Sequence, residues 1–203
     1  VEHPEVKAIS FTGGTMTGKH IAKTAAPMFK KLSLELGGKN PNLIFADCDY
    51  DKMMKITLKS SFANQGQICL CGSRIFVEQS IYEKFKTDFV KQVKALKIGH
   101  PLEDNLDLGA LVSKAHLEKV ESYINFAKQA DDMEILCGGQ RFQPKKYPNG
   151  FYLKPCVIEV KSNACKINQE EIFGPVVSIM PFKDEADALR LANDTKYGLS
   201  STI

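Results

Sequence analysis

Short apolar stretches alternate along the chain with longer segments of helical periodicity. Strand-like stretches, in which apolar residues cluster or alternate with polar ones, occur at residues 6–11, 31–36, 42–45, 74–78, 134–137, 152–160, 176–182 and from 199 onward. Segments with helical spacing of apolar residues lie between them, at residues 16–28, 49–63, 81–93, 114–127 and 185–193. Strands that alternate with helices favour an α/β fold with a mostly parallel sheet.

The sequence also marks helix starts and helix faces. Ser80, with Glu83 three residues later, predicts a capping box, and Ser113 is the predicted N-cap of the following helix. These two helices carry apolar stripes, formed by Ile81, Phe85, Phe89 and Val93 and by Leu117, Val120, Ile124 and Ala127. Two earlier helices are expected to bury Ile21, Ala22, Ala25 and Ala26, and Met53, Ile56 and Leu58.

Composition narrows the class of protein. The 203 residues are 43% hydrophobic and 25% charged, which excludes a disordered chain because such chains lack the apolar side chains that offset ordering entropy. No run reaches the ~18 apolar residues that span a bilayer, so we expect no membrane partner. The net charge is +3 without a basic run of five residues, which argues against a nucleic-acid partner.

The cysteines and the ends of the chain carry two further expectations. Six cysteines occur at loose spacing and no signal-peptide pattern is present, so we expect reduced thiols and a cytoplasmic protein. The chain starts at Val1 without an initiator Met, and its last residues read as the start of a strand. We therefore expect a piece of a longer chain.

A glycine turn between a strand and a helix is the first candidate for chemistry. Thr12, Gly13, Gly14 and Gly18 lie where a strand would run into a helix start, whose free N–H groups and positive dipole suit a phosphate. The spacing matches neither the Gly-x-Gly-x-x-Gly fingerprint nor a P-loop. A purely structural turn is the alternative.

A second candidate is the pair Cys69 and Cys71, which glycines flank on both sides. Cys69 could be a nucleophile presented in a turn, and the pair could be redox-active or metal-binding, although two cysteines supply only half of a usual metal site. Both could equally be small core residues. Spacing alone leaves these readings open.

Two carboxylate segments complete the set of candidates. Glu35 ends an alternating strand and precedes two glycines, and the run from Glu170 to Pro175 sets a carboxylate and an aromatic ring before Gly-Pro. The first could be a catalytic group or a solvated edge residue. The second could clamp a ribose and a ring, or be a turn into the next strand.

Taken in this order, the four segments resemble the aldehyde dehydrogenase superfamily over essentially the whole chain. The matching motifs are the glycine turn at 11–18, Glu-Leu-Gly-Gly-Lys at 35–39, Asn-Gln-Gly-Gln-x-Cys at 64–69 and Glu-Ile-Phe-Gly-Pro at 171–175. Gly14 departs from the pattern, since many members carry Ser there. Segments 31–41, 60–71 and 113–120 are most similar to a branch of the family that oxidises a semialdehyde.

The resemblance implies a role for each candidate residue. Cys69 would be the nucleophile that forms a thiohemiacetal and then a thioester, and Glu35 the general base for hydrolysis. The implied cofactor is NAD, with no metal. Its pyrophosphate would lie near Thr12, Gly13, Gly14 and Gly18, and its nicotinamide end near Leu36, Glu171 and Phe173.

The resemblance also implies the domain organisation. Residues 1–38 would be the C-terminal part of a Rossmann-like NAD-binding domain, and residues 39–203 a three-layer α/β/α catalytic domain truncated at both ends. The full-length enzyme would be a homo-oligomer acting on a small-molecule aldehyde. Because most of the cofactor domain would lie upstream, we expect the isolated 203-residue chain to be inactive.

Three alternative functions remain at this point. Within the family, the substrate could be a broad-range aliphatic or a betaine-type aldehyde. Outside it, Cys69 and Glu35 could serve a cofactor-independent thioesterase or esterase. A non-enzymatic structural relative is the third, and retention of both residues counts against it.

Overall fold

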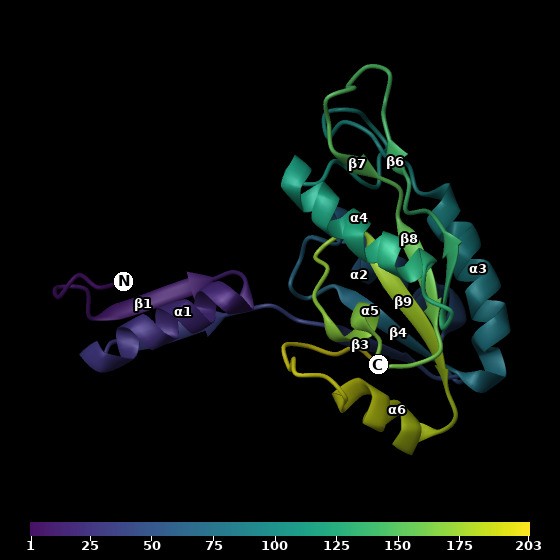
Figure 1. Ribbon diagram of the computed structural model, residues 1–203. Helices are drawn as coiled ribbons and strands as arrows, with labels where there is room; N and C mark the ends of the chain where they lie inside the picture. The colour runs from purple at the N-terminus through teal and green to yellow at the C-terminus, as the bar shows by residue number, and fades with distance from the viewer. The chain divides into compact units, whose positions relative to one another are not determined.

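The computed structural model describes residues 1–203, and the chain divides into two compact units, Val1–Gly38 and Lys39–Ile203 (Figure 1). In the first unit, strands β1 (Ala8–Thr12) and β2 (Lys31–Glu35) pair in parallel. Helix α1 (Thr15–Ala25) and the 3₁₀ turn η1 (Ala26–Met28) connect them. This order confirms a strand, a helix and a strand in the first 38 residues.

The α-helix expected over residues 16–28 ends at Ala25, earlier than the sequence indicates. The chain continues as the 3₁₀ turn η1, and Phe29 closes that turn in the left-handed region, with φ 53°. Helix α1 buries Gly18, Ile21 and Ala25. The expectation that Ala26 shares this buried face is wrong, because Ala26 lies in the 3₁₀ turn and is exposed.

The second unit is built on a five-stranded sheet with the order β3-β4-β9-β8-β5. The strands are β3 (Asn40–Ile44), β4 (Gly72–Glu78), β9 (Val176–Phe182), β8 (Cys156–Val160) and β5 (Met133–Cys137). All neighbours pair in parallel except β5 and β8, which are antiparallel. The mostly parallel sheet is thus confirmed. A separate short pair joins β6 (Arg141–Phe142) to β7 (Tyr152–Leu153).

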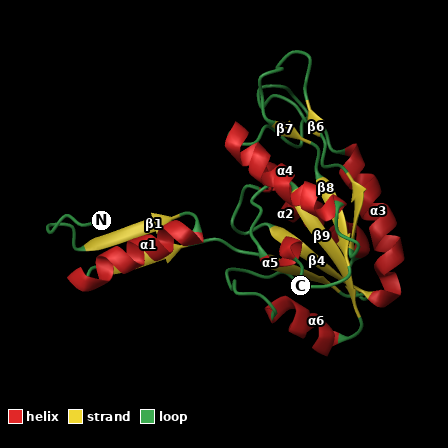
Figure 2. Ribbon diagram, in the orientation of Figure 1, coloured by secondary structure: helices red, strands yellow, loops and turns green.

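Helices cover both faces of this sheet (Figure 2). They are α2 (Tyr50–Phe62), α3 (Tyr82–Ala95), α4 (Lys114–Lys128), α5 (Lys166–Gln169) and α6 (Glu185–Asn193), with 3₁₀ turns η2 (Ala63–Gly66) and η3 (Gln79–Ile81). Helices α2 and α3 share one core with Val157 and Val177. Helix α4 packs with Ile158 and Val176. Because adjacent strand residues point to opposite faces, the layers are α/β/α, as expected.

Of the two predicted helix N-caps, the structure confirms Ser113 and contradicts Ser80. Ser113 is the N-cap of α4, and its side chain accepts a hydrogen bond from the His116 N–H at 3.2 Å. The capping box at Ser80 is wrong, because Ser80 Oγ donates to Glu78 at 2.6 Å and Ile81 is the N-cap of α3. Because the Ser80 hydroxyl donates to the Glu78 carboxylate, it does not cap the helix.

One helix face and two strand boundaries also differ from the sequence pattern. Helix α2 buries Met54, Thr57 and Ser61, whereas Ile56, expected to be buried, is 48% exposed. The expected strand over 152–160 is broken into β7 and β8 at Pro155, which has no N–H to donate. Beyond residue 199 a single bridge forms, between Thr202 and Asn42.

Candidate functional site

Three of the segments that the sequence singles out meet at one edge of the five-stranded sheet. Lys39 precedes β3, Cys69 precedes β4, and Phe173 precedes β9. These strands are parallel and adjacent in the order β3-β4-β9. Their amino ends therefore lie along the same edge, and the loops that enter them are neighbours.

The loop that carries Cys69 is fixed by the first residue of β3. The Asn40 side-chain amide donates to the carbonyl of Cys69 at 2.6 Å and to the carbonyl of Cys71 at 3.0 Å. Asn40 Oδ1 in turn accepts from the Ser200 N–H at 3.2 Å. Asn40 is 3% exposed, so these bonds are shielded from water. The thiol loop is thereby tied to the rigid sheet.

An unusual run of left-handed residues shapes the turn before Cys69. Asn64, Gln65 and Gly66 have φ values of 49°, 59° and 69°. A Cβ on Gly66 would lie 2.2 Å from the carbonyl oxygen of Gly174, closer than any real contact. Only glycine fits there. The contact sets the backbone of the Cys69 loop directly against the segment that contains Phe173.

Two glutamine side chains anchor the same loop to residues 109–112. Gln65 accepts from the Gly109 N–H at 2.9 Å and donates to the Ala110 carbonyl at 3.3 Å. Gln67 accepts from the Val112 N–H at 3.1 Å. These three bonds hold the strained turn against residues 109–112.

The two cysteines of this loop lie in different environments. Cys71 is 8% exposed, and burial raises the pKa of its thiol to about 11. A thiol with that pKa stays protonated at neutral pH, and the thiolate is the nucleophilic form. Cys69 is only partly buried. Of the two, Cys69 is the one a ligand can reach.

The segment before β9 presents an aromatic ring. Phe173 is 37% exposed and has a left-handed backbone, with φ 62°. Its carbonyl lies 2.6 Å from His116 Nε2, and the two rings stand edge to face with centroids 6.1 Å apart. Glu171 is partly buried two residues earlier. An exposed ring beside a carboxylate suits a planar ligand with hydroxyl groups.

In the first unit, the glycine turn and Glu35 lie together. The Gly13 N–H donates to the Glu35 carbonyl at 3.0 Å, and the Glu35 side chain at the end of β2 is exposed. A Cβ on Gly18 would lie 2.4 Å from a methyl carbon of Leu36. Helix α1 therefore packs closely at position 18 against the Leu36 side chain, which directly follows β2.

The start of α1 has the features of an anion site. Its N-cap is Gly14, which makes no side-chain capping bond, and the first turn contains no acidic residue. A Cβ on Gly14 would meet nothing within 4 Å, so space is open beside the turn. The first N–H groups of a helix have no partner inside the helix. These features fit the diphosphate of a dinucleotide.

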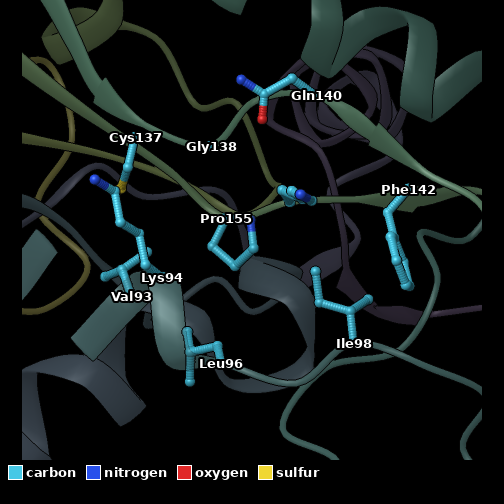
Figure 3. A pocket seen from close by; sticks show the side chains of 10 residues that line it. Val93, Lys94, Leu96, Ile98, Cys137, Gly138, Gln140, Phe142 and Pro155 are labelled. Carbon is cyan, nitrogen blue, oxygen red and sulfur yellow. The ribbon is translucent and has the colours of Figure 1, made fainter. Parts of the chain in front are cut away.

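A cavity of about 390 Å³ lies elsewhere, at the carboxyl end of α3 (Figure 3). Its walls include Leu96, Ile98, Phe142 and Pro155, with the buried thiol of Cys137 beside them. Cys69, Glu171 and Phe173 do not line it. The cavity lies near Pro155, at the entry to β8, and is therefore distinct from the place at β3, β4 and β9 where the candidate residues gather.

The structure holds no group of three His, Cys, Asp or Glu side chains that could bind a metal ion. None of its helices combines the length and the apolar character needed to cross a bilayer. All six cysteines are free.

Sequence reasoning missed several residues that shape the site. Asn40, Gln65, Gln67 and His116 hold loops through hydrogen bonds to backbone atoms. The one signal for Asn40 is a polar residue at the head of a strand that is otherwise fully buried. The side chains of Gln65 and His116 reach partners 44 and 57 residues away, and no local pattern indicates such contacts.

Comparison with known proteins adds independent findings. The sequence model described as "Aldehyde dehydrogenase family" matches residues 1–203. The chain is 48% identical to 2-aminomuconic semialdehyde dehydrogenase of Bos taurus, over all of this chain and 42% of that protein. It is 42% identical to 4-trimethylaminobutyraldehyde dehydrogenase A of Danio rerio, over 99% of this chain and 40% of that protein.

A solved structure agrees with these similarities. Betaine aldehyde dehydrogenase from Staphylococcus aureus, in complex with NAD⁺, matches with a TM-score of 0.94 and 42% identity. The match covers 98% of this chain and 39% of that one. The chain thus spans about two fifths of the length of the relatives it matches.

Proposed function

This chain belongs to the aldehyde dehydrogenase family, and from that premise we propose that the full-length protein oxidises an aldehyde to a carboxylate with NAD as its cofactor. The observation that carries the proposal is the position of Cys69. It is the accessible thiol of its loop, and the Gly66–Gly174 contact sets that loop against the segment of Phe173. Such an oxidation needs a nucleophile close to the groups that hold the cofactor, and we propose that Cys69 and Phe173 fill these two roles at one edge of the sheet.

Cys69 would start the reaction as a nucleophile. Its thiolate sulfur forms a bond to the aldehyde carbon, and the C=O electron pair moves onto oxygen to give a thiohemiacetal. The Cys69 N–H makes no hydrogen bond within the protein, so it is free to donate to that oxygen. A fixed donor at the developing charge stabilises the transition state.

Glu35 would act as the base in the second half of the reaction. Its exposed carboxylate takes a proton from water, whose oxygen attacks the thioester carbon. The carbon–sulfur bond breaks, a carboxylate leaves, and the Cys69 thiol is restored. The Gly13 N–H supports this role by fixing the Glu35 backbone at the end of β2.

We also propose which residues would contact the cofactor. We assign Val1–Gly38 to the end of the NAD-binding domain and Lys39–Ile203 to the catalytic domain. Thr12, Gly13, Gly14 and Gly18 would hold the pyrophosphate at the start of α1, while Leu36, Glu171 and Phe173 would hold the nicotinamide ribose and ring. When bound, NAD supplies the acceptor for the hydride that leaves the substrate carbon.

For the substrate, we propose 2-aminomuconate semialdehyde or a similar semialdehyde. The support is that the four vertebrate relatives named for this activity are 46–48% identical over the whole chain. Relatives named for 4-trimethylaminobutyraldehyde are 41–43% identical. A trimethylammonium or broad aliphatic aldehyde is therefore the second candidate.

A substrate panel tests both parts of the proposal. The full-length enzyme is given NAD and each of 2-aminomuconate semialdehyde, 4-trimethylaminobutyraldehyde, betaine aldehyde and an aliphatic aldehyde, and NADH formation is followed. We expect the highest kcat/KM for the semialdehyde. A higher kcat/KM for a trimethylammonium aldehyde would reassign the substrate. Ester or thioester hydrolysis that does not need NAD, without NADH formation, would reject the oxidation itself.

A further inference from the structure

One face of helix α4 contacts the segment that enters β9 at three successive points. His116 Nε2 lies 2.6 Å from the Phe173 carbonyl oxygen. Lys119 Nζ donates to the Glu171 carbonyl at 3.3 Å, and the Tyr123 hydroxyl donates to the Glu170 carboxylate at 2.7 Å. In Figure 1 this segment, the stretch after α5, runs beside α4.

The spacing along α4 explains how one helix makes all three contacts. His116, Lys119 and Tyr123 are three and four residues apart, which places them in a row on one helix face. Val120 adds a packing contact in the same row, because a Cβ on Gly174 would lie 2.7 Å from its Cγ2. The helix thus holds the segment through side chains along about two turns.

His116 makes the contact nearest the exposed ring. A carbonyl oxygen only accepts hydrogen bonds, so the imidazole must carry its proton on Nε2. The bond orients the Phe173 peptide, and Phe173 occupies a left-handed conformation that non-glycine residues rarely adopt. Gly66 lies against the carbonyl of the next residue, Gly174. The strained residue and its neighbour are therefore each held by a contact to another segment.

We propose that His116 is a positioning residue for the cofactor: through the Phe173 carbonyl it holds the Phe173 ring and the adjoining Glu171 ready for the nicotinamide end of NAD. The proposal rests on the proposed function. A segment that is already ordered binds its ligand without the entropy cost of fixing it. Loss of the His116 bond would let the strained peptide relax, and binding would then have to restore it.

The direct test is the dissociation constant of NAD for the full-length protein, measured by calorimetry without aldehyde. We expect His116→Ala to raise this constant about fivefold, which corresponds to ~1 kcal/mol. His116→Gln keeps an N–H donor and should bring the constant back to within about twofold of the unsubstituted protein. The matched control is Asn125→Ala, an exposed substitution on the same helix, for which we expect no change.

Steady-state kinetics separate positioning from general damage. With His116→Ala, we expect the KM for NAD to rise with the dissociation constant, while the KM for the aldehyde stays within about twofold. Should that variant fail to fold, Tyr123→Phe removes one hydroxyl from the same row and should raise the NAD constant about twofold.

The possible results distinguish the inference from its premise. If the unsubstituted protein binds NAD and oxidises aldehyde, but His116→Ala and Tyr123→Phe bind NAD equally well, the positioning role is wrong and the proposed function stands. A loss in His116→Ala that His116→Gln does not recover also contradicts the role. If the unsubstituted protein does not bind NAD, the proposed function and the inference both fail.

Discussion

Two cysteines two residues apart differ in accessibility, because Cys71 is buried and Cys69 is only partly buried. Burial raises the pKa of the Cys71 thiol to about 11, and its Sγ lies against the Ala63 carbonyl at 4.0 Å. The sequence alone left nucleophile, redox, metal and core readings open for this pair. The structure supplies what spacing lacked, namely which thiol faces the core.

The first prediction separates the two thiols. Cys69→Ala in the full-length enzyme should abolish turnover, because no other thiol of the loop is accessible. Cys71→Ala should keep most of the activity and lower the free energy of unfolding by about 1 kcal/mol, since a small buried side chain is lost. NADH formation and thermal unfolding are measured for both. The opposite pattern of activities would identify Cys71 as the nucleophile.

Glu35 supports a second prediction at this scale. Glu35→Gln keeps the size of the side chain but removes the base, so the thioester would form once and then persist. Rapid mixing should show a burst of NADH of about one equivalent per active site, followed by turnover at least about 100-fold slower. Mass spectrometry should find the acyl group on Cys69. Normal steady-state turnover would exclude Glu35 from the mechanism.

Lys39 gives a prediction about pH. Burial, and secondly the nearby charge of Arg74, lowers the pKa of Lys39 from 10.5 to about 7. Between these values the unfolded chain binds more protons than the folded one, so the Lys39 contribution to stability rises with pH from about 7 to 10.5. Comparing unfolding free energies of the full-length protein and Lys39→Met isolates this contribution. Over this pH range, the unfolding free energy of the unsubstituted protein should rise relative to that of Lys39→Met by up to ~1.4 kcal/mol per pH unit. A difference that does not change with pH would contradict the lowered pKa.

At the scale of elements, the sequence predicts the helices and strands better than their faces and ends. Periodicity identified the stripes of α3 and α4 because their apolar residues recur every three or four positions. It failed for Ile56, since α2 buries Thr57 and Ser61 through hydrogen bonds to Asn42 and Gly72 rather than through apolar contact. A pattern of hydrophobicity does not reveal partners of that kind.

Gly66 in η2 lies against Gly174, just before β9, and this contact supports a prediction about stability and about the reactivity of Cys69. Gly66→Ala adds a Cβ that would lie 2.2 Å from Gly174 O at a residue with φ 69°. The two loops must separate, so we expect a loss of at least about 2 kcal/mol in stability and a slower reaction of Cys69 with a thiol reagent. Gly198→Ala is the control, because a Cβ there meets nothing within 4 Å. Equal behaviour of the two variants would show that the loops do not depend on this contact.

At the scale of the whole molecule, the amino ends of three parallel strands gather residues that are far apart in the sequence. Chain order places Asn40, Cys69 and Phe173 in separate segments, yet the strand order β3-β4-β9 makes them neighbours. Motif resemblance named most of the candidate residues in advance. These residues are positioned by the strand order and by long-range side-chain hydrogen bonds. Both arise from tertiary packing, so the local sequence pattern does not predict them.

The division into two units leads to the last prediction. The chain spans about two fifths of its relatives, and the NAD-facing residues proposed for Val1–Gly38 are a single strand–helix–strand unit. Lys39–Ile203 has its own sheet and cores, and the bonds from Asn40, Gln65 and Gln67 that hold the Cys69 loop all lie within it. We therefore expect the purified 203-residue chain to react with a thiol reagent at Cys69, while NAD-dependent aldehyde oxidation is absent and the full-length enzyme shows both. Aldehyde oxidation by the short chain would mean that its 203 residues already suffice to bind the cofactor. Failure of Cys69 to react in a folded short chain would instead mean that the loop is shaped by residues outside it, contrary to the bonds from Asn40, Gln65 and Gln67.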